Sequence, residues 1–205
     1  MNGDFSQGDV GFGSDFLSGL AGTQGHAYNV ATNPSSVHGA GASYSDQSGD
    51  GKMMVINGVK QQTSSNVVWS ETVSVSPGET YNFSVFVSSW YLGGRAELKF
   101  RINGVDMVSN YLAPGSLAIW EQVAFEWDSG SSTSAEIEIL NTSIIELGNA
   151  FALDNIVFES DSPATQSNLI LNGDFSLGNN GFQSGFVYGV TGTQGASYIV
   201  DTTPT

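Results

Sequence analysis

The chain has 205 residues, 20 acidic against five basic side chains, a formal net charge of −15 and no cysteine. So few Lys and Arg residues argue against partners such as nucleic acid or anionic membranes, because no basic patch can displace counterions from phosphates. The lack of cysteine excludes disulfides and thiolate metal sites. Apolar runs such as residues 53–56 fall far short of the ~20 residues that cross a bilayer, so no membrane insertion is expected.

The N-terminal segment recurs near the end of the chain. Residues 2–34 align with residues 172–204 at a constant offset of 170 positions, without gaps, and 19 of the 33 aligned pairs are identical. The opening Asn2-Gly3-Asp4-Phe5-Ser6 is repeated in full at 172–176. An internal repeat with a domain-sized period predicts tandem copies of one domain rather than a solenoid.

The repeat sets the expected domain boundaries. We predict a complete domain at residues 1–160, a linker at 161–168 and the N-terminal part of a second copy at 169–205. The linker is polar, contains Pro163 and lacks large apolar side chains. The last segment is too short to close a core of its own.

The second copy begins with Leu169-Ile170-Leu171, which has the composition of a strand. The first copy has Met1 in place of this strand, so we expect its sheet to present an unpaired edge. Residues 169–205 could fill that edge in the same or in a neighbouring molecule. This predicts a homo-oligomer as one alternative.

Alternating apolar and polar residues mark several strands, in segments 81–88, 95–102, 123–127 and 135–139. No segment carries a sustained helical period. We predict an all-β fold, a two-sheet antiparallel jelly-roll β-sandwich of about eight strands. Turn dipeptides separate the strands: Asn57-Gly58, Pro77-Gly78, Asn103-Gly104 and Ser129-Gly130.

Four segments together resemble the galactose-binding-like jelly-roll domains, the fold of many carbohydrate-binding modules. They are residues 2–12, 53–58, 68–81 and 151–158, and they span the first copy. The resemblance implies a non-catalytic carbohydrate-binding module of a multidomain secreted or cell-surface protein, of bacterial type. The alternative is a structural or adhesive repeat, or a component of a fibre or viral particle, that associates with neighbouring copies by strand complementation.

Sugar binding would need exposed rings, because the C–H face of a sugar stacks on an aromatic plane while polar side chains bind its hydroxyls. Strand alternation explains several aromatic residues poorly, and Trp90-Tyr91 precede Gly93-Gly94 as if at the mouth of a loop. Ordinary loop packing is the alternative. The candidate ligand-binding residues are Trp90, Tyr91, Arg95, Tyr111, Tyr44 and His38.

The loop Asp46-Gln47-Ser48-Gly49-Asp50-Gly51 matches the start of an oxygen-ligand Ca²⁺ loop. Asp46, Ser48 and Asp50 would supply ligands, and Gly51 would permit the bend. Asn57 stands where such loops place a bidentate glutamate. The alternative is a polar hairpin loop.

The resemblance implies a second structural Ca²⁺ site. Galactose-binding-like domains often hold the ion near the N-terminal motif, closed by an aspartate of the C-terminal strand, and Asp4 and Asp154 match those positions. Ser6 stands where the family often has an acidic residue. The alternative is a pair of solvated turn carboxylates.

Three basic residues, Arg95, Lys99 and Arg101, alternate along one segment, and we expect ion pairs with Glu136 and Glu138 on a neighbouring strand.

Catalysis has little support in the sequence, so we expect no enzyme. The two histidines, His26 and His38, lie near no nucleophile motif, and Ala196 replaces His26 in the repeat. A glycosidase carboxylate pair stays open as an alternative.

Overall fold

In the computed structural model the described residues are 2–19, 25–49, 51–58, 66–143 and 148–161, with 187–188, 197–198 and 200 near the C-terminus. The chain divides into two units, Met1–Ser162 and Pro163–Thr205. Among the candidate residues, Asp50 lies outside the described part, and so does the expected strand at 169–171.

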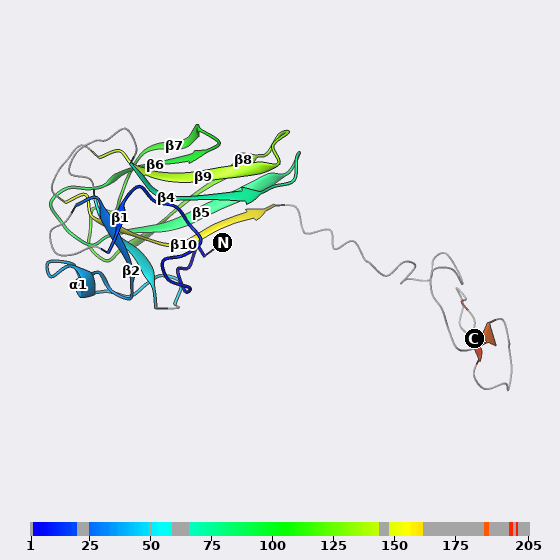
Figure 1. Cartoon of the computed structure of the whole chain (residues 1–205), viewed down its shortest axis with the longest axis horizontal. Helices are drawn as coiled ribbons and strands as arrows, with labels where there is room; N and C mark the ends of the chain where they lie inside the picture. The colour runs from blue at the N-terminus through cyan, green and yellow to red at the C-terminus, as the bar shows by residue number, and fades with distance from the viewer. Residues whose placement is uncertain are drawn as a thin grey trace. The chain divides into compact units, whose positions relative to one another are not determined.

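Strands dominate the first unit (Figure 1), and its described residues include a single four-residue helix. No helix in the described residues is both long enough and apolar enough to cross a membrane. In chain order the elements are β1 (Leu17–Ser18), β2 (Ala27–Ala31), α1 (Pro34–Val37), β3 (Met53–Asn57), β4 (Val67–Ser74), β5 (Thr80–Ser89), β6 (Glu97–Ile102), β7 (Val105–Leu112), β8 (Trp120–Asp128), β9 (Ser134–Asn141) and β10 (Phe151–Ser160).

The strands form two sheets that pack face to face. One has the order β1-β2-β3-β10-β5-β8, and the other has the order β4-β9-β6-β7. Every pairing is antiparallel except that of β1 with β2. The predicted all-β jelly-roll sandwich is confirmed, with more strands in the described residues than the eight expected.

The core lies between the sheets and follows the alternation seen in the sequence. In β6, Leu98, Phe100 and Ile102 are buried, while the charged residues between them lie on the outer face. Val85 of β5 and Ile137 of β9 are buried in the same cluster. Each such side chain contributes about 1.5–3 kcal/mol when it leaves water, so the inward faces of these alternating strands stabilise the sandwich.

A smaller cluster covers the outer face of the six-stranded sheet. Met53 and Val55 point away from the core that holds Met54 and Ile56, because neighbouring residues of a strand face opposite sides. They pack with Trp90 and several alanines, and Val37 and Tyr44 of the segment around α1 lie against them. The chain after β2 therefore closes over this face.

The N-terminal segment is anchored in the sandwich by its repeated motif. The Nδ2 of Asn2 donates to Gly8 O at 2.8 Å and to Val10 O at 2.9 Å, and Phe5 is completely buried. The carbonyl of Gly3 accepts a hydrogen bond of 2.9 Å from the amide of Ile156 in β10. These contacts fix the direction in which the following residues leave.

Part of the edge of β4 is covered by this segment. Gly13 and Ser70 exchange two backbone hydrogen bonds, of 2.8 and 2.9 Å, and the amide of Asp15 donates to Val67 O at 2.9 Å. Gly11, with φ +87°, then marks a turn away from the strand. The segment therefore follows β4 over its first half only.

Two short strands are described in the second unit, β11 (Val187–Tyr188) and β12 (Ser197–Tyr198), and they pair in parallel. Val187 pairs with Ser197 in this unit, and Leu17 pairs with Ala27 in the first unit. Adding 170 to the numbers of the first pair of strands gives the second, so the two registers are the same. This is the pairing that a repeat would give. The second copy and its boundaries stay predictions.

The close approach of Gly3 to β10 gives a test of the anchoring. A Cβ at Gly3 would lie 1.8 Å from the carbonyl oxygen of Ile156, whereas a Cβ at Gly8 meets nothing within 4 Å. We expect Gly3→Ala to lower the free energy of unfolding by more than about 3 kcal/mol, because the backbone of β10 or of the N-terminal segment would have to shift. Such a loss is at the high end for a single substitution. Gly8→Ala, at φ +82°, should cost only about 1–2 kcal/mol. Urea unfolding measures both, and equal losses would contradict the anchoring.

Candidate functional site

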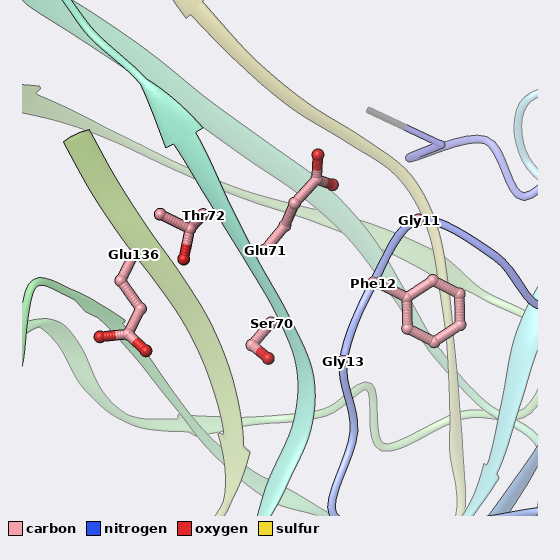
Figure 2. Close-up of a pocket in the computed structure, with 7 residues that line it drawn as sticks. All are labelled: Gly11, Phe12, Gly13, Ser70, Glu71, Thr72 and Glu136. Atoms are coloured by element: carbon pink, nitrogen blue, oxygen red, sulfur yellow. The ribbon is translucent and has the colours of Figure 1, made fainter.

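A hollow of about 560 Å³ opens where the N-terminal segment leaves the edge of β4 (Figure 2). Gly11-Phe12-Gly13 forms one wall, and Ser70, Glu71 and Thr72 of β4 with Glu136 of β9 form the other. The lining presents two carboxylates, two hydroxyls and peptide groups. No cationic side chain is among these lining residues.

The wall formed by Gly11-Phe12-Gly13 is supported by aromatic packing. The ring of Phe12 packs against Phe5 at 5.7 Å and against Tyr28 at 5.9 Å between ring centroids. A Cβ at Gly13 would lie 2.9 Å from the Oγ of Ser70, so the two walls come together at a residue without a side chain. The hollow is therefore bounded by elements that the core keeps in place.

The two carboxylates of the hollow leave the sheet on opposite faces. Glu71 lies opposite the buried Ile137, whereas Glu136 lies opposite the exposed Thr72. Figure 2 shows the two carboxylates pointing in different directions. Burial raises the pKa of Glu71 above its usual range. Glu136 is exposed, and the described ion pairs do not include it.

Basic side chains on the outer face of the four-stranded sheet are already paired. Lys99 Nζ lies 2.7 Å and Arg101 Nε 3.0 Å from Asp106, and Arg101 Nη1 lies 3.6 Å from Glu138. Hydrogen bonds from Lys99 and Arg101 lower the pKa of Asp106. The expected pairing with Glu138 is confirmed, Asp106 is an additional partner, and the described structure shows no such pair for Glu136.

Three of the candidate ligand-binding residues form one ring cluster. Ring centroids are 5.2 Å apart for His38 and Trp90, and 6.5 Å apart for His38 and Tyr91. Trp90 is only 1% exposed, and its Nε1 donates to the carbonyls of Ile56 and Phe151 at 3.0 and 2.9 Å. The expectation that Trp90 offers its face to a ligand is wrong, because the chain around α1 covers it.

Arg95 and Tyr111 lie away from this ring cluster and make hydrogen bonds within the fold. The Nη2 of Arg95 donates to Leu112 O at 2.9 Å, and its Nε donates to Ala113 O. The hydroxyl of Tyr111 donates to Glu121 at 3.3 Å, which links β7 to β8. Burial and the neighbouring Glu121 raise the pKa of Tyr111.

Tyr44 packs edge-on against Trp120, with ring centroids 5.8 Å apart, and the indole of Trp120 donates to Ser45 O at 3.3 Å. Burial raises the pKa of Tyr44 to about 12. The predicted ligand-binding residues are thus divided among separate groups. Throughout the described part of the chain, aromatic side chains are buried or half-buried, so a broad exposed stacking platform is absent there.

The predicted calcium loop is closed by hydrogen bonds of Asp46. Its Oδ2 accepts from the amides of Gly49 at 2.6 Å and Gly51 at 3.0 Å, and from the hydroxyl of Ser48 at 3.3 Å. Asp50, the third expected ligand, lies outside the described residues.

Asp154, on the outer face of the six-stranded sheet, holds this loop in place by accepting hydrogen bonds from it. Its carboxylate is fully buried and accepts from the amides of Gln47 at 2.7 Å, Ser48 at 2.8 Å and Asn155 at 2.8 Å. Burial raises the pKa of Asp154, while these hydrogen bonds act in the opposite direction. Asp4 instead closes a turn, accepting from the amide and hydroxyl of Ser6 at 3.1 and 2.9 Å.

Calcium prefers six to eight oxygen ligands, and the donors that converge on Asp154 are three backbone N–H groups and the hydroxyl of Ser48 at 3.4 Å. Within the described residues, no three His, Asp or Glu side chains gather in a way that could hold a metal ion. The arrangement around Asp154 therefore does not fit an ion without rearrangement. Calcium binding at either place stays a prediction.

Sequence reasoning missed the lining of the hollow. Glu71 carries a signal, because it interrupts the inward row of Trp69 and Val73 in β4 with a charge. The sequence predicts an ion pair for Glu136, and it marks Phe12 only as part of the repeated segment. Their meeting depends on contacts between segments far apart in the chain, which periodicity does not reveal.

Comparison with known proteins gives similarities at the level of the fold. No family model matches the chain, and no curated protein matches it. Among solved structures, TmCBM61 in complex with β-1,4-galactotriose aligns with a TM-score of 0.49 and 11% identity, over 78% of this chain and 96% of that one. The CBM22-1 xylan-binding domain from Paenibacillus barcinonensis Xyn10C aligns with a TM-score of 0.43 and 16% identity, over 75% and 95% of the two chains.

A CBM4 structure aligns with a TM-score of 0.46 and 11% identity, over 78% of this chain and 98% of that one. The names of these three structures are those of carbohydrate-binding modules. At such identities the likeness concerns the fold alone.

The hydrogen bonds accepted by Asp154 predict that substituting Asp154 costs more stability than substituting Asp4. Asp154→Asn places an amide group among N–H donors and leaves part of them unsatisfied, so we expect a loss of about 1–3 kcal/mol in the free energy of unfolding. Asp4→Asn keeps an acceptor in an exposed turn and should change stability by less than about 0.5 kcal/mol. Denaturant unfolding at pH 7 measures both changes. If Asp154→Asn leaves the free energy of unfolding unchanged, the hydrogen bonds to Asp154 do not stabilise the fold.

Calcium binding is tested by melting the chain in millimolar Ca²⁺ and in EDTA at low salt. An ion held only by the folded state raises the melting temperature by mass action, and Asp50→Asn should abolish that rise if the loop holds the ion. Identical melting curves would exclude both calcium sites.

Proposed function

We propose that the chain is a non-catalytic carbohydrate-binding module whose ligand occupies the hollow between Gly11–Gly13 and Glu136. The observation that carries this proposal is the lining: Glu136 and the hydroxyls of Ser70 and Thr72 leave the sheet on one face of an open hollow, and no cationic side chain is among the lining residues. Carboxylates accept hydrogen bonds from sugar hydroxyls, and the hydroxyls of Ser70 and Thr72 both donate and accept. A polyhydroxylated ligand therefore finds complementary groups on the wall formed by β4 and β9.

The charge of the site favours a neutral sugar. Glu136 would repel the carboxylate of a uronic acid or a sulfate group, and the chain as a whole carries a net charge of −15. Neutral polysaccharides are the ligand class that this surface favours. An extracellular or cell-surface setting is part of the proposal.

Binding without turnover is supported by the placement of the carboxylates. The acid and base of a glycosidase flank one bond from two sides, whereas Glu71 and Glu136 leave opposite faces of the sheet. The two groups therefore do not face one another across a common bond.

Titration calorimetry with β-1,4-galactotriose, xylohexaose and a galacturonic acid trimer tests the proposal. We expect binding of at least one neutral oligosaccharide and none of the acidic trimer. Glu136→Gln should weaken binding by about 10- to 100-fold, since a hydrogen bond to a charged group contributes about 1.5–3 kcal/mol.

Glu126→Gln, on the exposed face of β8, is the matched control and should leave affinity unchanged. Equal affinity of Glu136→Gln and the unsubstituted chain would place the ligand elsewhere. Failure of the full neutral panel would contradict carbohydrate binding for these sugars, and release of reducing ends would contradict the non-catalytic assignment.

A further inference from the structure

The loop of residues 46–52 connects the two places at which the resemblance implies calcium ligands, Asp4 and Asp154. Two backbone amides of the loop donate to Asp154, at 2.7 and 2.8 Å. At the end of the loop, the Nζ of Lys52 donates to the carbonyl of Ser6 at 2.7 Å. Ser6 belongs to the turn that the carboxylate of Asp4 closes. The loop is therefore bound both to the N-terminal motif and to β10.

The backbone of Lys52 is anchored on both sides. The carboxylate of Asp46 accepts from the amides of Gly49 and Gly51, at 2.6 and 3.0 Å, and so fixes the loop up to the residue before Lys52. Met53 follows, which is completely buried at the start of β3. An anchored backbone leaves only the side chain to be ordered, which lowers the entropy cost of the hydrogen bond that Lys52 donates.

Oxygen atoms of the N-terminal motif that could bind a metal ion already accept hydrogen bonds. The carbonyls of Asn2, Gly3 and Phe5 accept from backbone amides, at 3.2, 2.9 and 2.8 Å. The carboxylate of Asp4 accepts from the amide and the hydroxyl of Ser6, and the carbonyl of Ser6 accepts from the ammonium group described above. Calcium needs six to eight oxygen ligands, so an ion here would have to displace these donors.

We infer that the ammonium group of Lys52 takes the place of the calcium ion that the resemblance implies at Asp4 and Asp154. A lysine ammonium group brings a positive charge and three N–H donors to oxygen atoms. Within the described part of the chain, no three His, Asp or Glu side chains gather as metal ligands would. The inference concerns what stabilises the fold, so it goes beyond the proposed sugar binding and does not depend on it.

Lys52 supplies its charge to segments that carry three carboxylates. Asp4, Asp46 and Asp154 belong to the segments that Lys52 and its loop connect by hydrogen bonds. The chain has five basic side chains against 20 acidic ones, and a cation among these segments lowers the repulsion between their carboxylates. Because this cation is part of the chain, its contribution does not depend on the concentration of a free ion.

Melting curves of the full chain at low salt, in millimolar Ca²⁺ and in EDTA, test the inference. They are recorded in an Asp50→Asn background, which removes a ligand of the separate calcium loop that the sequence predicts. We expect the melting temperature to differ by less than about 1 °C between the two conditions. Lys52→Met keeps the apolar stem and removes the ammonium group, and should lower the melting temperature by about 3 °C or more.

Three further variants separate the positive charge from other effects. Lys52→Arg keeps a cation with N–H donors and should retain most of the stability, whereas Lys52→Gln keeps an N–H donor without charge and should melt like Lys52→Met. Lys99→Met removes the same charge from a pair on the outer face of the sandwich, and should lower the melting temperature clearly less, since such pairs contribute little. Circular dichroism checks that each variant keeps its strands.

Four results would overturn the inference. One is a rise in melting temperature with Ca²⁺ in the Asp50→Asn background that Asp4→Asn abolishes, because the ion would then occupy the place assigned to Lys52. The second is an unchanged melting temperature in Lys52→Met. The third is full stability in Lys52→Gln, which would show that the charge is not needed. The last is an equal loss in Lys99→Met, which would reduce the effect to the net charge of the chain.

Discussion

The docking of the N-terminal segment against both sheets is the constraint on which the site depends. Phe5 enters the core, Gly3 meets β10 at a distance that no side chain permits, and Gly13 pairs with Ser70. This docking creates one wall of the hollow and covers the first half of the β4 edge. The sequence that repeats along the chain is therefore the sequence that shapes the surface proposed to bind ligands.

Buried polar groups hold the loops in this fold where cysteine is absent. Asp154 accepts three backbone amides, and the indole of Trp90 satisfies two carbonyls on neighbouring strands. Leaving one such group unpaired costs about 1–3 kcal/mol, comparable to the burial of one large apolar side chain. Both groups connect distant segments to the outer face of the six-stranded sheet, so both stabilise the fold.

The sequence predicts the sandwich well and the site poorly, and the two results have one physical cause. Alternation in 95–102 and 135–139 is a local signal, and burial of one face of β6 and β9 follows from it directly. For Trp90 the prediction was wrong. Its place after a strand and before two glycines predicts exposure, but the segment around α1, about fifty residues earlier in the chain, packs over it. Glu71 and Glu136 meet the N-terminal segment only through such long-range packing, which no periodicity encodes.

The central claim is that a neutral sugar occupies the hollow beside the N-terminal segment. A crystal structure of the chain with a bound neutral oligosaccharide tests it most directly. The account predicts sugar hydroxyls within hydrogen-bond distance of Glu136 and of Ser70 or Thr72, against the wall formed by residues 11–13. A sugar seated instead on His38 and Tyr91, with the hollow filled by solvent, would contradict it.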